Sequence, residues 1–499
     1  MKQSSQKHFY RYYSILLLST LLLSCEKDDS FFKRNSTSKT IELRTDEQLL
    51  RDSIYYYYNL YSLWSDESIP DYNHLFRFTE AYQNNNEVLT ALKSLTPAYS
   101  GYTQGVYDRF SYLQELNSSS SAAIGKLHMD LNNGYGISTS IGITEDGLAH
   151  PIIHFVEGGS PAALGGIRRG DVILELNDDK DLSIPVDCST GQCFVKDPDR
   201  RSYVVNQILK AQSDLIMNIK VQHADGSIIT RRLAYTTYDI DAVTHEALYL
   251  TPNKNVGYIA LSSFEQIENN NQNQRHIDYA FQNFANHQIR DLIVDLRYNP
   301  GGYVDAAIYI ANKIINKNGH QQLMLKYQVN KYLSENRQKY NFEDVYFQRS
   351  GQLELSTVYF LVTSNTASAA EMLINVLRPY MDIRIIADNT RTYGKPVGFF
   401  PQTIMHKTVL WPISFKLENA QQYGDYWLGL QADRTFVKDY IFRDFGDSKE
   451  NMIAAALEES LPNYNNNTQQ RSKRSSTAFE KVALENIDPI KTRGLIKTP

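Results

Sequence analysis

A serine and a lysine occupy two loops that together could support nucleophilic catalysis. Ser368 follows the apolar run 357–363, which predicts a buried strand, and precedes a helical pattern at 369–377. We therefore expect it at a helix N-terminus, where unpaired N–H groups and the helix dipole favour an oxyanion. Lys395 lies in the loop 392–398 after another apolar strand. A lysine kept neutral by burial can accept a serine proton, so this pair could form an acyl-enzyme.

Histidine is the more usual base for a serine nucleophile. The same region contains four histidines, and none lies in a glycine-marked turn or beside a carboxylate in a recognisable pattern: His276, His287, His320 and His406. We interpret them as surface or packing residues, which leaves Lys395 as the candidate base.

A third loop carries two consecutive glycines directly after a strand. The run 292–296 is apolar throughout, as in a buried strand, and Asn-Pro-Gly-Gly then ends it. Gly301 and Gly302 allow the backbone to approach another group closely. Arg297 has a structural interpretation, since an arginine at a buried strand end often pairs with a carboxylate such as Asp295.

The elements upstream of these loops form a separate β-rich region at 122–235. Residues 159–177 read as a short helix with proline at its start, a Gly-Gly stop and a strand, and this unit resembles a PDZ domain. The loop Gly134, Tyr135, Gly136 and Ile137 lies where such domains bind a peptide's C-terminal carboxylate through backbone N–H groups. The strand 138–143 would pair with the peptide. The alternative is a PDZ fold used only for packing.

The three loops together resemble the carboxyl-terminal processing proteases, also called tail-specific proteases. The motifs are Asp-Leu-Arg-Tyr-Asn-Pro-Gly-Gly at 295–302, Thr-Ala-Ser-Ala-Ala-Glu at 366–371 and Tyr-Gly-Lys at 393–395, in the family's order. The resemblance covers about 122–460 and includes the upstream PDZ-like region. It implies a protease core with a crotonase-like ββα superhelix, and no cofactor.

The resemblance also assigns roles to single residues. It implies Ser368 as nucleophile and Lys395 as general base. The N–H of Ala369, with one from Gly301 or Gly302, would form the oxyanion hole. Substrates would be polypeptides with free, apolar C-termini, and the chain would be a serine endopeptidase.

Three positions refine this assignment. Glu371 matches an acidic family position, where we expect a structural or orienting role. Pro396 replaces the usual glycine, and Phe399 stands where many relatives carry a glutamine that orients the lysine. These departures leave open which residue would act as a third catalytic residue beside Ser368 and Lys395.

Two other functions also remain as alternatives: a non-catalytic PDZ scaffold and a relative that binds an apolar ligand.

The N-terminus resembles a bacterial lipoprotein signal. Basic residues precede the apolar run 15–23, which is too short to span a bilayer, and Cys25 follows. The chain would be cut before Cys25 and acylated there; an ordinary secretory signal is the alternative. The run 27–29 resembles a surface-export tag of Bacteroidetes-type lipoproteins. We expect a lipid-anchored protein of the cell envelope, on the outer membrane.

The sequence as a whole predicts an α+β multidomain protein. Its expected parts are a signal peptide (1–24), a tether (25–40), a helical region (41–117), a PDZ-like domain (122–235), the protease core (239–460) and a disordered tail (461–499). A length of 499 residues fits several domains. The net charge of −5 gives no reason to expect nucleic acid as a partner.

Two further cysteines remain once Cys25 is assigned to lipid. Cys188 and Cys193 could form a disulfide in an exported protein, or remain as two reduced thiols in a loop. A metal site is not expected, because ligands at known spacings are missing.

Overall fold

The computed structural model describes residues 44–99, 101, 105–116, 131–189, 193–268, 270–462, 481–487 and 495–497. The chain divides into two compact units, residues 1–49 and 50–499. In the first unit, the described residues begin helix α1 (Asp46–Tyr61), where the Thr45 N–H donates to Gln48 Oε1 at 2.9 Å and the Gln48 N–H donates to Thr45 Oγ1 at 3.3 Å.

The predicted signal and Cys25 lie outside the described residues, so acylation stays a prediction. Within the described ranges, none of the helices has both the length and the apolar character that a membrane span requires.

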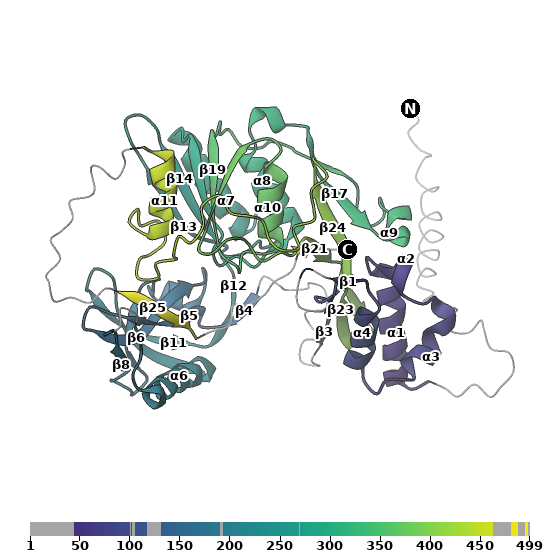
Figure 1. Cartoon of the computed structure of the whole chain (residues 1–499), viewed down its shortest axis with the longest axis horizontal. Coiled ribbons are helices and arrows are strands. Elements are labelled where there is room, and N and C mark those ends of the chain that lie inside the picture. Colours follow the sequence, from purple (N-terminus) through teal and green to yellow (C-terminus); the bar gives the residue numbers. More distant parts are fainter. Residues whose placement is uncertain are drawn as a thin grey trace, which may run out of the picture. The chain divides into compact units, whose positions relative to one another are not determined.

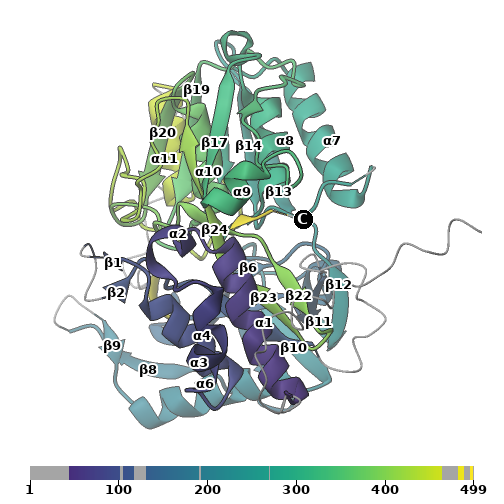
Figure 2. The same ribbon diagram turned by 90° about the vertical axis from the view of Figure 1, so that its right-hand side faces the viewer.

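The N-terminal part of the second unit is helical only as far as residue 94. It contains α1, α2 (Ser65–Ser68), η2 (Tyr72–His74), α3 (Leu75–Thr79) and α4 (Asn85–Ser94). Side chains of α1, α3 and α4 share one buried cluster, and these helices lie side by side in Figure 2. The prediction of a helical region at 41–117 is wrong at its end, because Pro97 stops the helical run and short strands follow: β1 (Ala98–Tyr99), β2 (Gly105–Val106) and β3 (Tyr112–Glu115).

The next region, which we call the β domain, spans the described residues 131–239. Its main sheet has the order β11-β10-β7-β6-β5, and α6 (Pro198–Ser213) packs on it. The strands are β5 (Ile137–Ile143), β6 (Leu148–Val156), β7 (Val172–Leu176), β10 (Ile216–Gln222) and β11 (Ile228–Ala234), with β8 (Ile184–Asp187) and β9 (Phe194–Val195) at one side and β4 (Leu131–Gly134) paired with β12 (Thr236–Asp239). The predicted helix, stop and strand are present as α5 (Pro161–Leu164) and β7, with the Ser160 Oγ capping α5.

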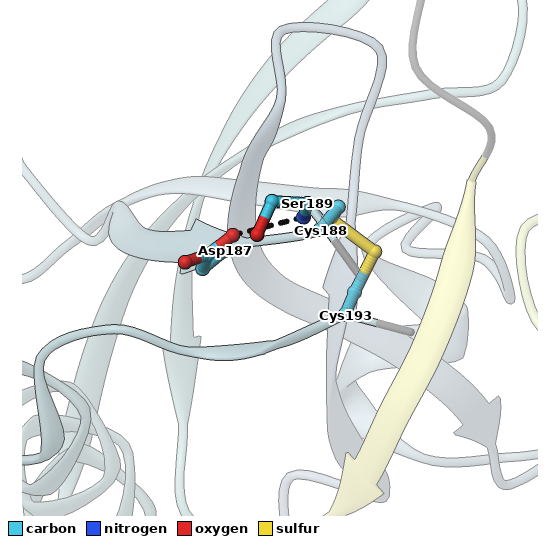
Figure 3. The surroundings of a disulfide bond; sticks show 4 residues. All are labelled: Asp187, Cys188, Ser189 and Cys193. Carbon is cyan, nitrogen blue, oxygen red and sulfur yellow. Dashed lines mark hydrogen bonds between the residues drawn. A yellow bond between two sulfur atoms is a disulfide. The ribbon is translucent and has the colours of Figure 1, made fainter. Parts of the chain in front are cut away.

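A disulfide joins Cys188 to Cys193, with 4.1 Å between their Cα atoms (Figure 3). The Ser189 N–H donates to Asp187 Oδ1 at 2.9 Å in the same turn. Of the two alternatives that the sequence left open, the structure therefore has the bonded form.

The C-terminal tail contributes two strands, so the prediction of disorder throughout 461–499 is wrong for the described residues. Strand β25 (Val482–Asn486) pairs antiparallel with β5, and the two are adjacent in Figure 1. Val482, Leu484 and Ile487 pack against the core of the β domain. Strand β26 (Leu495–Ile496) is fully buried. These apolar residues give the tail enough burial to become ordered.

The main sheet of the core is α/β in character. Its order is β13-β14-β15-β19-β20, parallel from β14 onward: β13 (Val243–Tyr249), β14 (Val256–Leu261), β15 (Asp291–Asp295), β19 (Thr357–Val362) and β20 (Asp382–Ala387). Alternate side chains of the strands enter two different apolar clusters. One face is covered by α7 (Gln272–Asn286), α8 (Val304–Ile314) and α10 (Ala369–Leu377), and the other by α11 (Asn451–Ser460). Burial on both faces explains the nearly continuous apolar strands.

A second sheet has the order β16-β26-β21-β24-β17-β18. Its strands are β16 (Gly302–Tyr303), β17 (Leu323–Val329), β18 (Val345–Tyr346), β21 (Val397–Phe399), β24 (Ile413–Asn419) and β26, and η4 (Lys317–Gly319) and α9 (Lys331–Glu335) lie in its connections. A small sheet joins β22 (Gln402–Ile404) and β23 (Thr408–Trp411) to β3. The protein is therefore a mixed α/β multidomain chain, and its two core sheets bring the predicted loops together.

Candidate active site

The serine turn and the glycine loop leave the same edge of the main core sheet. Strands β15 and β19 are parallel neighbours, so their carboxyl ends lie together. The Thr363 Oγ1 donates to the Arg297 carbonyl at 2.6 Å, and the Thr366 Oγ1 donates to the Leu296 carbonyl at 2.7 Å. The Ala367 N–H donates to the Asn299 carbonyl at 3.1 Å. Short bonds thus fasten the two loops to each other.

Ser368 has the backbone conformation of a strained turn. Its φ is 63° and its ψ is −114°, values that a residue with a β-carbon rarely adopts. The side chain is buried, and among the described residues its Oγ has no hydrogen-bond partner. The predicted position of Ser368 at a helix N-terminus is therefore confirmed, and its hydroxyl is unpaired there among the described residues.

The glycine loop lies directly against the serine turn. A β-carbon on Gly301 would come within 2.7 Å of Ser368 Cβ and 3.1 Å of the Ala369 nitrogen. Gly301 and Gly302 also have φ values of 109° and 142°, which favour glycine. Only glycine permits this approach of the two backbones.

The three predicted oxyanion donors differ in their surroundings. The Gly301 N–H donates to Asn299 Oδ1 at 2.9 Å and is therefore already engaged. Ala369 is the first residue of α10, so its N–H has no acceptor inside the helix. Gly302 lies in β16 and pairs with Leu495 of the tail. These contacts favour the N–H of Ala369 as a donor, because the Gly301 N–H is already engaged and Gly302 lies in a paired strand.

Lys395 is enclosed by aromatic rings. Only 6% of its surface is exposed, and its Nζ lies 4.3 Å from the ring centre of Phe399 and 4.8 Å from that of Phe110. Burial lowers the pKa of Lys395 to about 7, although the more distant charges of Glu371 and Asp108 act in the opposite direction. A substantial fraction of this lysine is therefore neutral near pH 7.

Glu371 connects the serine turn to the lysine loop. Its Oε2 accepts the N–H of Ser368 at 2.9 Å and the N–H of Lys395 at 2.8 Å. Its Oε1 accepts the N–H of Gly394 at 2.8 Å and the Thr392 hydroxyl at 2.5 Å. Burial raises the pKa of Glu371, and the four donors act against that rise. One carboxylate thus holds both loops in register, which fits the orienting role expected for it.

Two features of the lysine environment could not be recognised from local motifs. Phe110 comes from the N-terminal region, far from Lys395 in the sequence, and nothing in its neighbourhood marks it. The sequence marks Phe399 only as a departure from a glutamine, whereas its ring forms a wall of the lysine site.

A cavity of about 790 Å³ adjoins these loops and is lined in part by Arg109, Ser364 and Tyr393.

Arg297 has the structural role that the sequence offered as an alternative. Its Nη2 lies 2.6 Å from Asp295 Oδ2, and its Nη1 lies 2.6 Å from Asp439 Oδ1 and 3.1 Å from Glu450 Oε2. Arg169 of the β domain reaches the same Asp439 at 2.5 Å. This buried ionic cluster joins the β domain to the glycine loop, and the sequence did not reveal it.

The predicted carboxylate-binding loop lies between β4 and β5 of the β domain. The Gly136 carbonyl accepts the Glu157 N–H at 2.8 Å, and the Tyr135 carbonyl accepts the Ala162 N–H at 3.1 Å. A β-carbon on Gly136 would fall 2.1 Å from Ser160 Cβ, so the loop packs tightly on the start of α5. Gly134 pairs with Thr236, and Ile137 pairs with Val156.

Metal chemistry has no obvious site in the described part of the chain, where no group of three or more His, Cys, Asp or Glu side chains could hold an ion.

This chain is similar in sequence to known peptidases. Residues 255–410 match the model of peptidase family S41. A chloroplastic C-terminal processing peptidase of Tetradesmus obliquus is 25% identical over 252 residues, which cover 48% of this chain and 46% of that protein. A Staphylococcus epidermidis protein named "Probable CtpA-like serine protease" is 23% identical over 238 residues, covering 48% of this chain and 40% of the relative. The chain thus matches less than half the length of these relatives.

The fold has a solved counterpart. The crystal structure of a candidate S41 protease from Bacteroides fragilis superposes with a TM-score of 0.58 at 21% identity, covering 85% of this chain and 99% of the other. This likeness concerns the fold alone. The family model and the curated relatives therefore show that this chain is similar to S41 peptidases and C-terminal processing proteases.

Proposed function

We propose that this protein is a serine endopeptidase that cleaves polypeptides with Ser368 as nucleophile and Lys395 as general base. The observation that carries the proposal is the environment of Lys395, whose burial among rings lowers its pKa to about 7. A lysine that is partly neutral near pH 7 is costly to build and is typical of a catalytic site. Its backbone shares a carboxylate oxygen with that of Ser368.

The first step would be proton transfer from the Ser368 hydroxyl to the neutral amine of Lys395. The Ser368 oxygen then attacks the carbonyl carbon of the substrate, and a tetrahedral intermediate forms. Its negative oxygen would accept hydrogen bonds from the N–H of Ala369, at the positive end of α10, and from the N–H of Gly301 or Gly302.

The second step would break the peptide bond. The ammonium of Lys395 returns its proton to the leaving amine, which gives an acyl-enzyme and a free amino terminus. Water, deprotonated by the same lysine, then hydrolyses the ester and regenerates the Ser368 hydroxyl. Every proton in this cycle passes through one lysine, so no metal or cofactor is required.

The β domain would select the substrate in the manner of a PDZ domain. A peptide would add to β5 as an antiparallel strand, with its apolar C-terminus directed to the loop Gly134, Tyr135, Gly136 and Ile137. The pairing of β5 with a strand of this chain's own tail supports that geometry. Cleavage would then occur near the substrate's C-terminus.

The site of action would be the cell envelope. Acylation of Cys25 would anchor the mature chain to the outer membrane, where exported polypeptides are its substrates. Incorporation of labelled fatty acid into the wild type but not into Cys25→Ser would test this part; equal labelling of both would refute it.

The decisive test is cleavage of an unfolded protein with an apolar C-terminus by residues 26–499. Ser368→Ala and Lys395→Ala should each abolish cleavage between pH 6 and about 10, whereas chelators should have no effect. Ser364→Ala is the matched control, because this serine lies in the same turn but outside the motif, and it should retain activity.

Two results would overturn the proposal. Cleavage that persists in Ser368→Ala would assign the nucleophile elsewhere. Binding of C-terminal peptides without cleavage by the wild type would instead identify a PDZ-type scaffold.

A further inference from the structure

The tail strand β25 occupies the edge of the β domain where a peptide would bind. Val482 pairs with Ile143 and Asn486 pairs with Ser140, so the tail runs antiparallel to β5 toward the loop 134–137. The Ile487 N–H continues this pairing by donating to the Thr139 carbonyl at 2.9 Å.

Side chains add specificity to this pairing. Val482, Leu484 and Ile487 pack against the apolar core of the β domain. Glu485 forms a two-pronged ion pair with Arg201 of α6, and both N–O distances are 2.5 Å. Glu485 raises the pKa of Arg201. The tail therefore covers the edge of β5 with a paired strand, and its Glu485 joins that strand to α6.

The tail strand β26 occupies a second site beside the catalytic loops. It lies between β16 and β21, where Leu495 pairs with both Gly302 and Gly398. Gly302 is a proposed oxyanion donor, and β21 begins two residues after Lys395. Close approach is required here, since a β-carbon on Gly398 would fall 2.8 Å from the Leu495 carbonyl oxygen.

Burial shows that β26 is a well-fitted element. Leu495 and Ile496 are 0% and 2% exposed and belong to the main apolar core. The Lys497 N–H donates to the Phe399 carbonyl at 3.1 Å, which extends the pairing past the strand. The Lys497 Nζ lies 5.1 Å from the ring centre of Tyr327.

From these contacts we propose that the C-terminal segment of this chain is an intramolecular competitor of its own substrates. Residues 482–487 cover the edge of β5 to which a peptide would add, and residues 495–497 fill a strand site between β16 and β21, beside the glycine and lysine loops. A polypeptide substrate must displace the tail from both. This inference rests on the proposed function and adds its regulation.

The tail also indicates which substrates compete best. They present an extended segment with apolar side chains at the positions of Val482, Leu484 and Ile487, and a carboxylate that reaches Arg201. Arg201 is thus a specificity-determining residue of the β5 site. A tethered segment acts at an effective concentration on the order of millimolar, so only good mimics of the tail displace it.

Peptide binding tests the competition without any need for catalysis. The probe is a fluorescein-labelled synthetic peptide of residues 481–497, and the protein is the full mature chain carrying Ser368→Ala. Adding Glu485→Arg places two cations together and loosens the tail, so the peptide should bind at least tenfold more tightly.

A matched control separates this effect from a general change of charge. Glu335→Arg reverses an exposed glutamate on α9, outside both tail sites, and should leave peptide binding unchanged. Equal peptide affinity for the Ser368→Ala chain with and without Glu485→Arg would overturn the competition. So would a change of equal size in Glu335→Arg.

Activity provides an independent readout of the second site. In the chain with an intact Ser368, Leu495→Asp should expel β26 and raise the initial cleavage rate severalfold, and added tail peptide should reverse the gain. Hydrogen exchange at β5 and β16 reports whether the tail has left. If the chain never cleaves but the tail still competes with the peptide, the proposed protease activity is refuted and the proposed competition stands. If the chain cleaves but the tail does not compete, the competition is refuted and the protease activity stands.

Discussion

Two basic side chains, Lys395 and Arg297, are buried in the protease core, and their surroundings differ in charge. Lys395 faces the rings of Phe110 and Phe399, and in the described part of the chain no carboxylate lies within ion-pair distance of its amine. Arg297 is completely buried, yet three carboxylates surround it. Both side chains lose their contact with water, but only the arginine receives compensating charge.

The difference appears in their proton affinities. Burial lowers the pKa of Lys395 to about 7. Burial also opposes the charge of Arg297, but Asp295, Glu450 and Asp439 outweigh it and raise the pKa of Arg297 well above its usual value. Lys395, buried without a carboxylate partner, can therefore lose its proton and act as a base. Arg297, buried among carboxylates, stays charged and cross-links the structure.

The largest expected effect concerns the activity of Lys395→Met. Methionine fills the ring-lined site but cannot accept a proton, so kcat/KM should fall by about a thousandfold or more. Steady-state cleavage of an unfolded protein provides the measurement. Thermal unfolding should show no loss of stability, because the variant removes a group that is costly to bury.

Lys395→Arg sharpens this first comparison. A guanidinium stays charged at any accessible pH, so the variant should be inactive and also less stable than the wild type. An active arginine variant would contradict the role of the lysine as a base.

The second effect concerns the stability of Arg297→Met. The substitution leaves the carboxylates of Asp295 and Glu450 without their buried partner, and the free energy of unfolding should fall by about 3–5 kcal/mol. Urea denaturation measures this loss, with Lys395→Met as the matched control. A loss below about 1 kcal/mol would show that the ionic cluster is not a cross-link.

The third effect is a dependence of stability on pH that only the lysine contributes. The pKa of Lys395 is about 7 in the folded chain and about 10.4 when unfolded, so between these values the unfolded chain binds one more proton. The free energy of unfolding should therefore rise with pH in this window, by about 1.4 kcal/mol per unit relative to Lys395→Met.

Urea denaturation at several pH values between 7 and 10 measures that difference. Lys331→Gln removes an exposed lysine and should follow the wild type throughout. Parallel curves for the wild type and Lys395→Met would mean that the lysine is charged in the folded chain.

The smallest effect comes from the ring wall. Phe399→Gln places a polar group beside the amine and should raise the pKa of Lys395. The rate near pH 7 should fall severalfold and recover above pH 8. Phe399→Leu keeps an apolar wall and should leave the pH profile in place; the same shift in both variants would show that ring volume, and not polarity, sets the pKa.

The local parts of this site could be predicted from the sequence. Ser368, Lys395 and the two glycines lie in short motifs, and strand, turn and helix each follow from their own residues. The ion pair of Arg297 with Asp295 was also predictable, because only one residue separates them. What the sequence did not reveal depends on contacts between distant segments: Phe110 at the lysine, Arg169 at Asp439, and the two tail strands.

The tail shows why such features escape a sequence reading. Its polar beginning suggests disorder throughout, and the apolar residues of β25 and β26 are too few to predict strands by themselves. They become strands only because β5, β16 and β21 provide backbone partners. Tertiary pairing therefore decides their structure, and no local pattern encodes it.

The measurement that tests the central claim most directly is the titration of the Lys395 side chain itself. In Ser368→Ala labelled with ¹³C at lysine Cε, the Lys395 signal is identified by its absence from the double variant with Lys395→Met. A midpoint near pH 7 is predicted for Lys395. A Lys395 midpoint at pH 9 or higher would contradict the account, because the lysine would then be charged when it must act as the base.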